Sequence, residues 1–209
     1  MFRRFERLEM KQTIKVEESM VHKRYREMTD VLYGGGDTGA YETDALDRSR
    51  REETCLYSIH NRPLLIDAYI RVDPWDHRAV RHAMHMAAGK GIAICINLPA
   101  AFASIRPPKP WDVPADQPPV GVWAPGSWGG HSMWAFEYDE RGIWLEHTWD
   151  LPAQLLTWRA AGFYMDEAHI VIDRVNEWRQ RKEVRESNFN MDDVVSAVNA
   201  VSSQKIKVA

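Results

Sequence analysis

The sequence lacks the features that mark several large classes of protein. Its 209 residues include two cysteines, Cys55 and Cys95, too few for a disulfide scaffold and typical of a reducing compartment. No apolar run approaches the roughly 20 residues that span a bilayer, and the first residues offer no apolar signal-peptide core. The formal net charge of −3 argues against binding nucleic acid through bulk positive charge. We therefore expect neither a membrane nor a nucleic acid as partner.

Tryptophan, by contrast, is abundant. The chain has nine tryptophans, and five of them fall between Trp123 and Trp149. Such a density indicates either a strongly aromatic core or an exposed adhesive surface, and the usual burial of large aromatic side chains favours the core. Hydrophobic residues at 44% and charged residues at 27% are ordinary for a globular protein of one domain with an extension.

The order of the expected elements indicates an α+β protein. Helices are expected over residues 1–32, 43–51, 77–88, 174–186 and 191–201, and strands over residues 64–72, 91–98, 132–138, 142–149 and 168–172. A hairpin turn is expected at 139–142, and a short helix or turn at 155–162. The strands should form a mostly antiparallel sheet with one strand–helix–strand step.

Three segments are expected along the chain: a helical arm at 1–32, a folded domain at 33–175 and a helical extension at 176–209. The arm is either a solvated helix on its own domain or a segment that docks on a neighbouring subunit. The apolar residues of the expected helix 191–201 have helical spacing, and this stripe fits a groove in its own domain or in a neighbour. The residues expected at interfaces are Phe2, Phe5, Leu8, Val194, Val195 and Val198.

Three histidines share one expected helix: His77, His82 and His85. A zinc-binding helix prefers a His-x-x-x-His spacing, or a nearby carboxylate with a third ligand elsewhere. We therefore interpret these histidines as solvated residues that flank the buried stripe of Val80 and Met84. We expect no metal and no cofactor.

Two further histidines lie at the ends of the expected hairpin. His131 precedes the first strand, and His147 lies near the end of the second. The start of one strand in an antiparallel hairpin lies beside the end of the next. His131 and His147 should therefore be neighbours at the same end of the sheet.

The segment 129–150 resembles the hairpin of papain-like cysteine peptidases that carries the catalytic histidine and the asparagine that orients it. His131, in Gly-Gly-His-Ser, matches the catalytic histidine; His147, in His-Thr-Trp-Asp, matches the asparagine. Residues 157–168 are similar to peptidase-like proteins of tailed bacteriophages. The resemblance implies a papain-like fold for the folded domain, with extra terminal helices.

The family mechanism needs a cysteine thiolate, and no cysteine stands where the resemblance requires it. Cys95 lies in an apolar strand, where burial raises the pKa of a thiol. Cys55 follows Glu52 and Glu53, whose negative charges disfavour a thiolate. His147 also replaces the orienting asparagine. The sequence therefore predicts a pseudoenzyme without an intact catalytic site.

The resemblance implies a non-catalytic structural protein of a tailed-phage virion (capsid, decoration or tail) that works through protein–protein contacts. Its partners would be other virion proteins or copies of itself, and it would occupy the host cytoplasm before assembly. One alternative is a thiol hydrolase with His131 as base. Another is a ligand- or glycan-binding module whose binding residues are Trp111, Trp123 and Trp128.

Overall fold

A computed structural model describes residues 18–35, 39–51, 58–59, 62–63, 65–87, 91–115, 119–146, 149, 151–173 and 196. The expected interface residues Phe2, Phe5, Leu8, Val194, Val195 and Val198 all lie outside this part of the chain. So do Cys55 and His147. The proposals that depend on these residues stay predictions.

The chain is divided into two compact units, and the larger one contains Ile70–Ile170. The smaller unit contains α2 (Glu18–Tyr33), α3 (Glu42–Ser49) and two short antiparallel strands, β1 (Ser58–Ile59) and β2 (Arg62–Pro63). Helix α2 ends at Gly34 and Gly35, which have φ angles of 77° and 89°. Only glycine adopts this conformation without a steric cost, so the glycine run stops the helix.

A six-stranded antiparallel open sheet forms the centre of the fold, which confirms the α+β class. The strands lie in the order β3-β8-β4-β5-β6-β7. Their bounds are β3 (Ile66–Val72), β4 (Ile92–Leu98), β5 (Gly129–Tyr138), β6 (Gly142–Glu146), β7 (Gln154–Thr157) and β8 (Met165–Asp173). The strands expected over 64–72, 91–98, 132–138 and 168–172 are therefore present.

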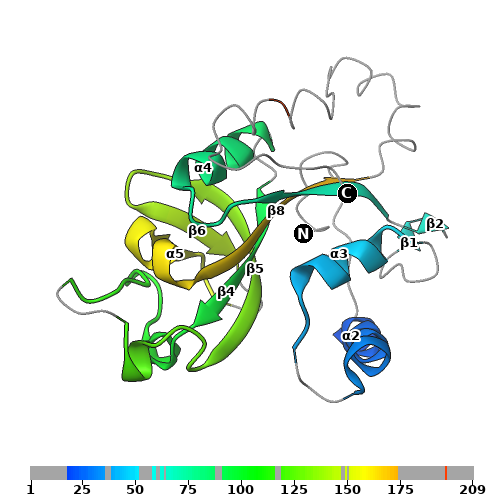
Figure 1. Ribbon diagram of the computed structural model, residues 1–209, viewed down its shortest axis with the longest axis horizontal. Helices are drawn as coiled ribbons and strands as arrows, with labels where there is room; N and C mark the ends of the chain where they lie inside the picture. Colours follow the sequence, from blue (N-terminus) through cyan, green and yellow to red (C-terminus); the bar gives the residue numbers. More distant parts are fainter. Residues whose placement is uncertain are drawn as a thin grey trace. The chain divides into compact units, whose positions relative to one another are not determined.

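Strand β4 is fully buried on one face, whereas on the other face Ala93 is buried and Cys95 and Asn97 are half-buried. Ile92, Ala93, Ile94, Ile96 and Leu98 are each at most 3% exposed. The strand pairs with β5 on one edge and with β8 on the other, and Figure 1 shows the three strands side by side. A face lined by three isoleucines and a leucine suits the middle strand of a sheet that is covered on that side.

Two helices accompany this sheet in the larger unit. Helix α4 (His77–Met86) starts at Asp76, whose carboxylate accepts the backbone N–H groups of Arg78 and Ala79 at 3.0 and 3.1 Å. Its buried face includes Val80 and Met84, as expected. A short helix or turn was expected over residues 155–162: residues 158–162 do lie in a short helix, α5 (Trp158–Tyr164), whereas residues 155–157 belong to β7.

The proline-rich segment between β4 and β5 supplies an aromatic core. It contains two short 3₁₀ helices, η2 (Ala100–Ser104) and η3 (Gly121–Trp123). The rings of Phe102 and Trp111 stack at 5.0 Å, and Tyr164 meets Phe102 edge-on at 5.2 Å. Trp111 also exchanges backbone hydrogen bonds with Leu155 and Thr157, so the segment is joined to β7.

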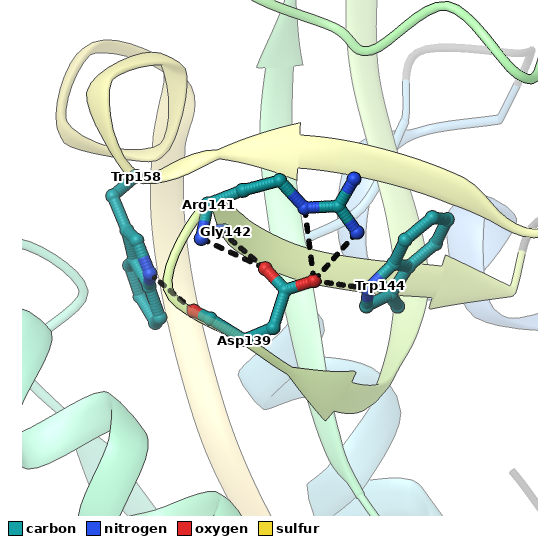
Figure 2. Close-up of polar contacts among 5 residues, drawn as sticks. All are labelled: Asp139, Arg141, Gly142, Trp144 and Trp158. Atoms are coloured by element: carbon teal, nitrogen blue, oxygen red, sulfur yellow. Dashed lines mark hydrogen bonds and ion pairs between the residues drawn. The ribbon is translucent and has the colours of Figure 1, made fainter.

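The hairpin turn between β5 and β6 is organised by Asp139 (Figure 2). One carboxylate oxygen accepts the backbone N–H groups of Arg141 and Gly142, and the other accepts the Arg141 guanidinium and the Trp144 indole. The Asp139 carbonyl accepts the Trp158 indole N–H at 2.9 Å. The hydrogen bonds from Arg141 and Trp144 lower the pKa of Asp139 to about 2.

Replacing Asp139 with Asn should lower the urea midpoint of unfolding at neutral pH, because the charge that these donors stabilise is lost. The folded state holds the pKa of Asp139 below its ordinary value of 3.8. Its stabilising contribution is therefore present above about pH 4 and is lost as the pH falls towards 2. The gap between wild type and Asp139→Asn should close over that range.

The matched control is Glu140→Gln, which removes the same charge from the neighbouring exposed residue. Its midpoint should equal that of the wild type at every pH. A gap for Asp139→Asn that stays constant between pH 5 and about 2 would contradict the assigned role of the carboxylate.

Candidate functional site

Three aromatic side chains gather at the start of β5. The imidazole of His131 stacks on the indole of Trp149, with ring centroids 4.5 Å apart and planes 14° from parallel. Trp128 contacts the same indole at 5.2 Å, with a tilt of 33°. We call these three residues the aromatic stack. Trp149 is thus the residue that connects the other two.

The β4–β5 ladder positions this stack. His131 lies opposite Ile96 in the ladder, and the backbone N–H of Trp128 donates to the carbonyl of Leu98 at 2.9 Å. Between them, Gly129 has a φ of 138°, which a residue with a side chain rarely adopts. The backbone therefore turns into the strand at a glycine, with Trp128 directly before the turn.

Part of the aromatic stack is exposed, together with two valines of the preceding loop. Trp128 and Trp149 are 43% and 40% exposed, and Val120 and Val122 are 62% and 60% exposed. Ser127 Oγ lies 3.3 Å from the Val122 carbonyl oxygen, which holds the two ends of the loop together. We call Val120, Val122, Trp128 and Trp149 the apolar patch. It contains no charged side chain.

The imidazole of His131 is half-buried beside this patch, and one of its faces is covered by Trp149. The described part of β6 ends at Glu146, which pairs with Trp134, three residues beyond His131. Because His147 lies outside the described residues, its expected proximity to His131 stays a prediction.

Cys95 is the one thiol that the described residues include, and it is close to His131 in the ladder. It pairs with Ser132 on β5, whereas His131 pairs with the next residue, Ile96. Successive side chains of a strand point to opposite faces of the sheet. The thiol and the imidazole therefore lie on opposite faces of the sheet, which is not the arrangement of a thiolate and its base.

Of the three tryptophans expected to bind a ligand, the structure leaves only Trp128 exposed. Trp111 is 2% exposed and stacked in the core, and Trp123 is half-buried with its ring edge-on to Phe102. Trp149, which was not among them, is brought to the site instead. No periodic signal marks Trp149, because it lies three residues beyond the end of β6.

Sequence patterns also gave no indication of a buried polar pair on β8. The Nε2 atom of His169 lies 3.7 Å from Oε2 of Glu167. Burial, together with the charge of Arg71, lowers the pKa of His169 to about 4, so the imidazole is neutral at pH 7. The contact is therefore between a carboxyl group and a neutral ring. No cluster of three metal-ligating side chains occurs among the residues that the structure describes.

The different places of Trp111 and Trp128 predict very different costs of truncation. Trp111→Ala should lower the free energy of unfolding by about 3–5 kcal/mol, because it leaves a cavity in the aromatic core. Trp128→Ala removes a side chain that is 43% exposed and should cost about 1 kcal/mol or less. Urea denaturation of the two variants measures both values. Equal costs would contradict the division into core and surface tryptophans.

Comparison with protein-family models, curated proteins and solved structures gives no match for this chain. The described helices include none that is long and apolar enough to cross a membrane.

Proposed function

We propose that the protein is a non-catalytic structural protein with a papain-like fold that works through protein–protein contacts in a tailed-phage virion. The observation that carries this proposal is the stacking of His131 on Trp149 beside the exposed Trp128. At the position that resembles a catalytic histidine, the chain has an aromatic contact and an apolar surface.

The surroundings of His131 do not favour catalysis. A general base must come within roughly 2.6–3.2 Å of the group that it deprotonates, directly or through one water. Cys95, the one thiol among the described residues, has its side chain on the opposite face of the sheet from His131 and is therefore not placed to be deprotonated by it. The substitution of His147 for the orienting asparagine supports the same interpretation.

The apolar patch supports binding to another protein. Tryptophan is enriched where proteins bind one another, and Trp128 and Trp149, whose rings are in contact, are 43% and 40% exposed. The turn that carries Val120 and Val122 has the backbone hydrogen bonds Trp123 N–H to Val120 O and Ala124 N–H to Gly121 O. Binding would therefore need little further ordering of this turn.

We propose that the apolar patch binds a second copy of the chain. The four residues of the apolar patch are uncharged, so two such patches can meet without charge repulsion between these side chains. A self-complementary patch suits the two-fold contacts that dominate homo-oligomers. A glycan-binding surface has less support, because Trp111 and Trp123 are not presented beside Trp128.

Trp128→Ser should weaken self-association, because it removes the largest exposed ring of the loop. Sedimentation velocity of the full chain should show an oligomer for the wild type and a shift to monomer for Trp128→Ser and for Val122→Ser. Trp75→Ser is the matched control, since Trp75 is 64% exposed but lies outside the patch. It should sediment as the wild type does.

Either of two results would overturn the proposed contact. One is a wild-type protein that stays monomeric at about 100 μM, a concentration at which even weak specific dimers form. The other is an oligomer that Trp128→Ser leaves intact. Circular dichroism of each variant shows whether it keeps the native fold.

A further inference from the structure

A pocket of about 270 Å³ lies beside helix α4, away from the residues of the aromatic stack. It is lined by Arg78, Arg81, His82 and His85 of the helix and by Tyr138 at the end of β5. Every lining residue can donate a hydrogen bond, and two of them are permanently charged. The pocket therefore has the chemistry of an anion site.

The amphipathic pattern of α4 creates this cluster. Arg81, His82 and His85 follow Arg78 by three, four and seven residues. The four side chains therefore share one face of the helix. The buried residues Ala79, Val80, Ala83 and Met84 occupy the other face. The ten residues of α4 include no Asp or Glu, so no side chain of the helix neutralises the positive charge of Arg78 and Arg81.

Two acids that flank the pocket in the sequence are engaged elsewhere. Asp76 accepts the N–H groups that cap α4, and both oxygens of Asp139 are engaged within its own turn (Figure 2). Neither Arg78 nor Arg81 forms an ion pair with any of the residues that the structure describes. Their charges are therefore available to a ligand.

Three contacts organise the pocket before any ligand binds. The guanidinium of Arg81 lies 4.4 Å from the ring centroid of Trp158, in cation–π geometry. The Trp158 indole is itself held by its hydrogen bond to the Asp139 carbonyl at 2.9 Å, and Tyr138 lies edge-on to it at 6.4 Å. Arg81 is thus oriented by a ring that the hairpin turn fixes.

His82 contributes an unsatisfied polar atom. Its Nε2 is buried and has no hydrogen-bond partner among the described residues. Buried polar atoms are almost always paired in native proteins, so an atom without a protein partner beside a pocket is able to bond to a ligand or to water there. This observation is independent of the charge of the arginines.

We propose that the α4 pocket binds a small phosphate-bearing anion, with Arg78 and Arg81 as charged donors and with His82 and Tyr138 as hydrogen-bonding partners. Arginine suits this role because its planar guanidinium can donate two parallel hydrogen bonds to phosphate oxygens. The volume of about 270 Å³ lies below the roughly 300–1,000 Å³ of sites for drug-sized ligands, which favours one or two phosphate groups. The net charge of −3 favours a small ligand over a nucleic-acid backbone.

Isothermal titration calorimetry with pyrophosphate, in a low-salt buffer without polyvalent anions, tests the proposal on the full chain. The wild type should bind in a one-to-one ratio. Arg78→Gln and Arg81→Gln should each weaken binding by about tenfold or more, because each removes charge-assisted hydrogen bonds. Lys109→Gln is the control, since it removes the same charge from an exposed side chain that does not line the pocket.

Absence of binding by the wild type at 10 mM pyrophosphate, or equal weakening by Lys109→Gln, would overturn the proposal. A second titration with a single-stranded oligonucleotide distinguishes the source of the phosphate. Weaker binding of the oligonucleotide than of pyrophosphate supports a small ligand. Tighter oligonucleotide binding that Arg78→Gln abolishes would contradict the small ligand and assign the pocket to a nucleic-acid backbone.

Discussion

The pairing of β4 with β5 and β8 is the constraint on which the rest of the larger unit depends. Because one face of β4 consists entirely of buried apolar side chains, the strand is stable only with partners on both edges and cover on that face. Its pairing with β5 then fixes every position from Gly129 to Ala135. The segment between the two strands has to return to the same end of the sheet, which brings Trp128 beside Leu98 and beside His131.

Sequence patterns predicted the elements whose signal is local. Helix α4 follows from Asp76 and the stripe of Val80 and Met84, and β4 follows from a continuous apolar run. The turn at Asp139 follows from its polar residues and the glycine at 142. In each case, the residues that carry the signal also make the stabilising contacts.

The features that patterns missed depend on contacts between distant segments. Residues 154–157 form a strand because they pair with β6 and because Trp111 hydrogen-bonds to Leu155 and Thr157. A short apolar run cannot be assigned to helix or strand by periodicity alone. The placement of β8 between β3 and β4 likewise depends on the whole sheet. The division of tryptophans into core and surface has the same origin, since Trp111 and Trp128 are both flanked by loop residues in the sequence.

The two surfaces proposed for the protein use different physical forces. The apolar patch would act by removing exposed rings from water, whereas the α4 pocket would act through charge and directed hydrogen bonds. Neither surface needs the side chain of Cys95 or a free face of His131. We propose further that neither Cys55 nor Cys95 forms a thiolate–imidazole pair with His131.

The rate of iodoacetamide alkylation at pH 7 measures this claim most directly, because a thiolate paired with an imidazolium reacts far faster than an ordinary thiol. Mass spectrometry assigns the label to Cys55 or Cys95. We predict slow labelling at both positions, with rates that His131→Ala leaves unchanged in the folded protein. Rapid labelling of either cysteine that slows in His131→Ala would contradict the account and show that His131 activates a thiol.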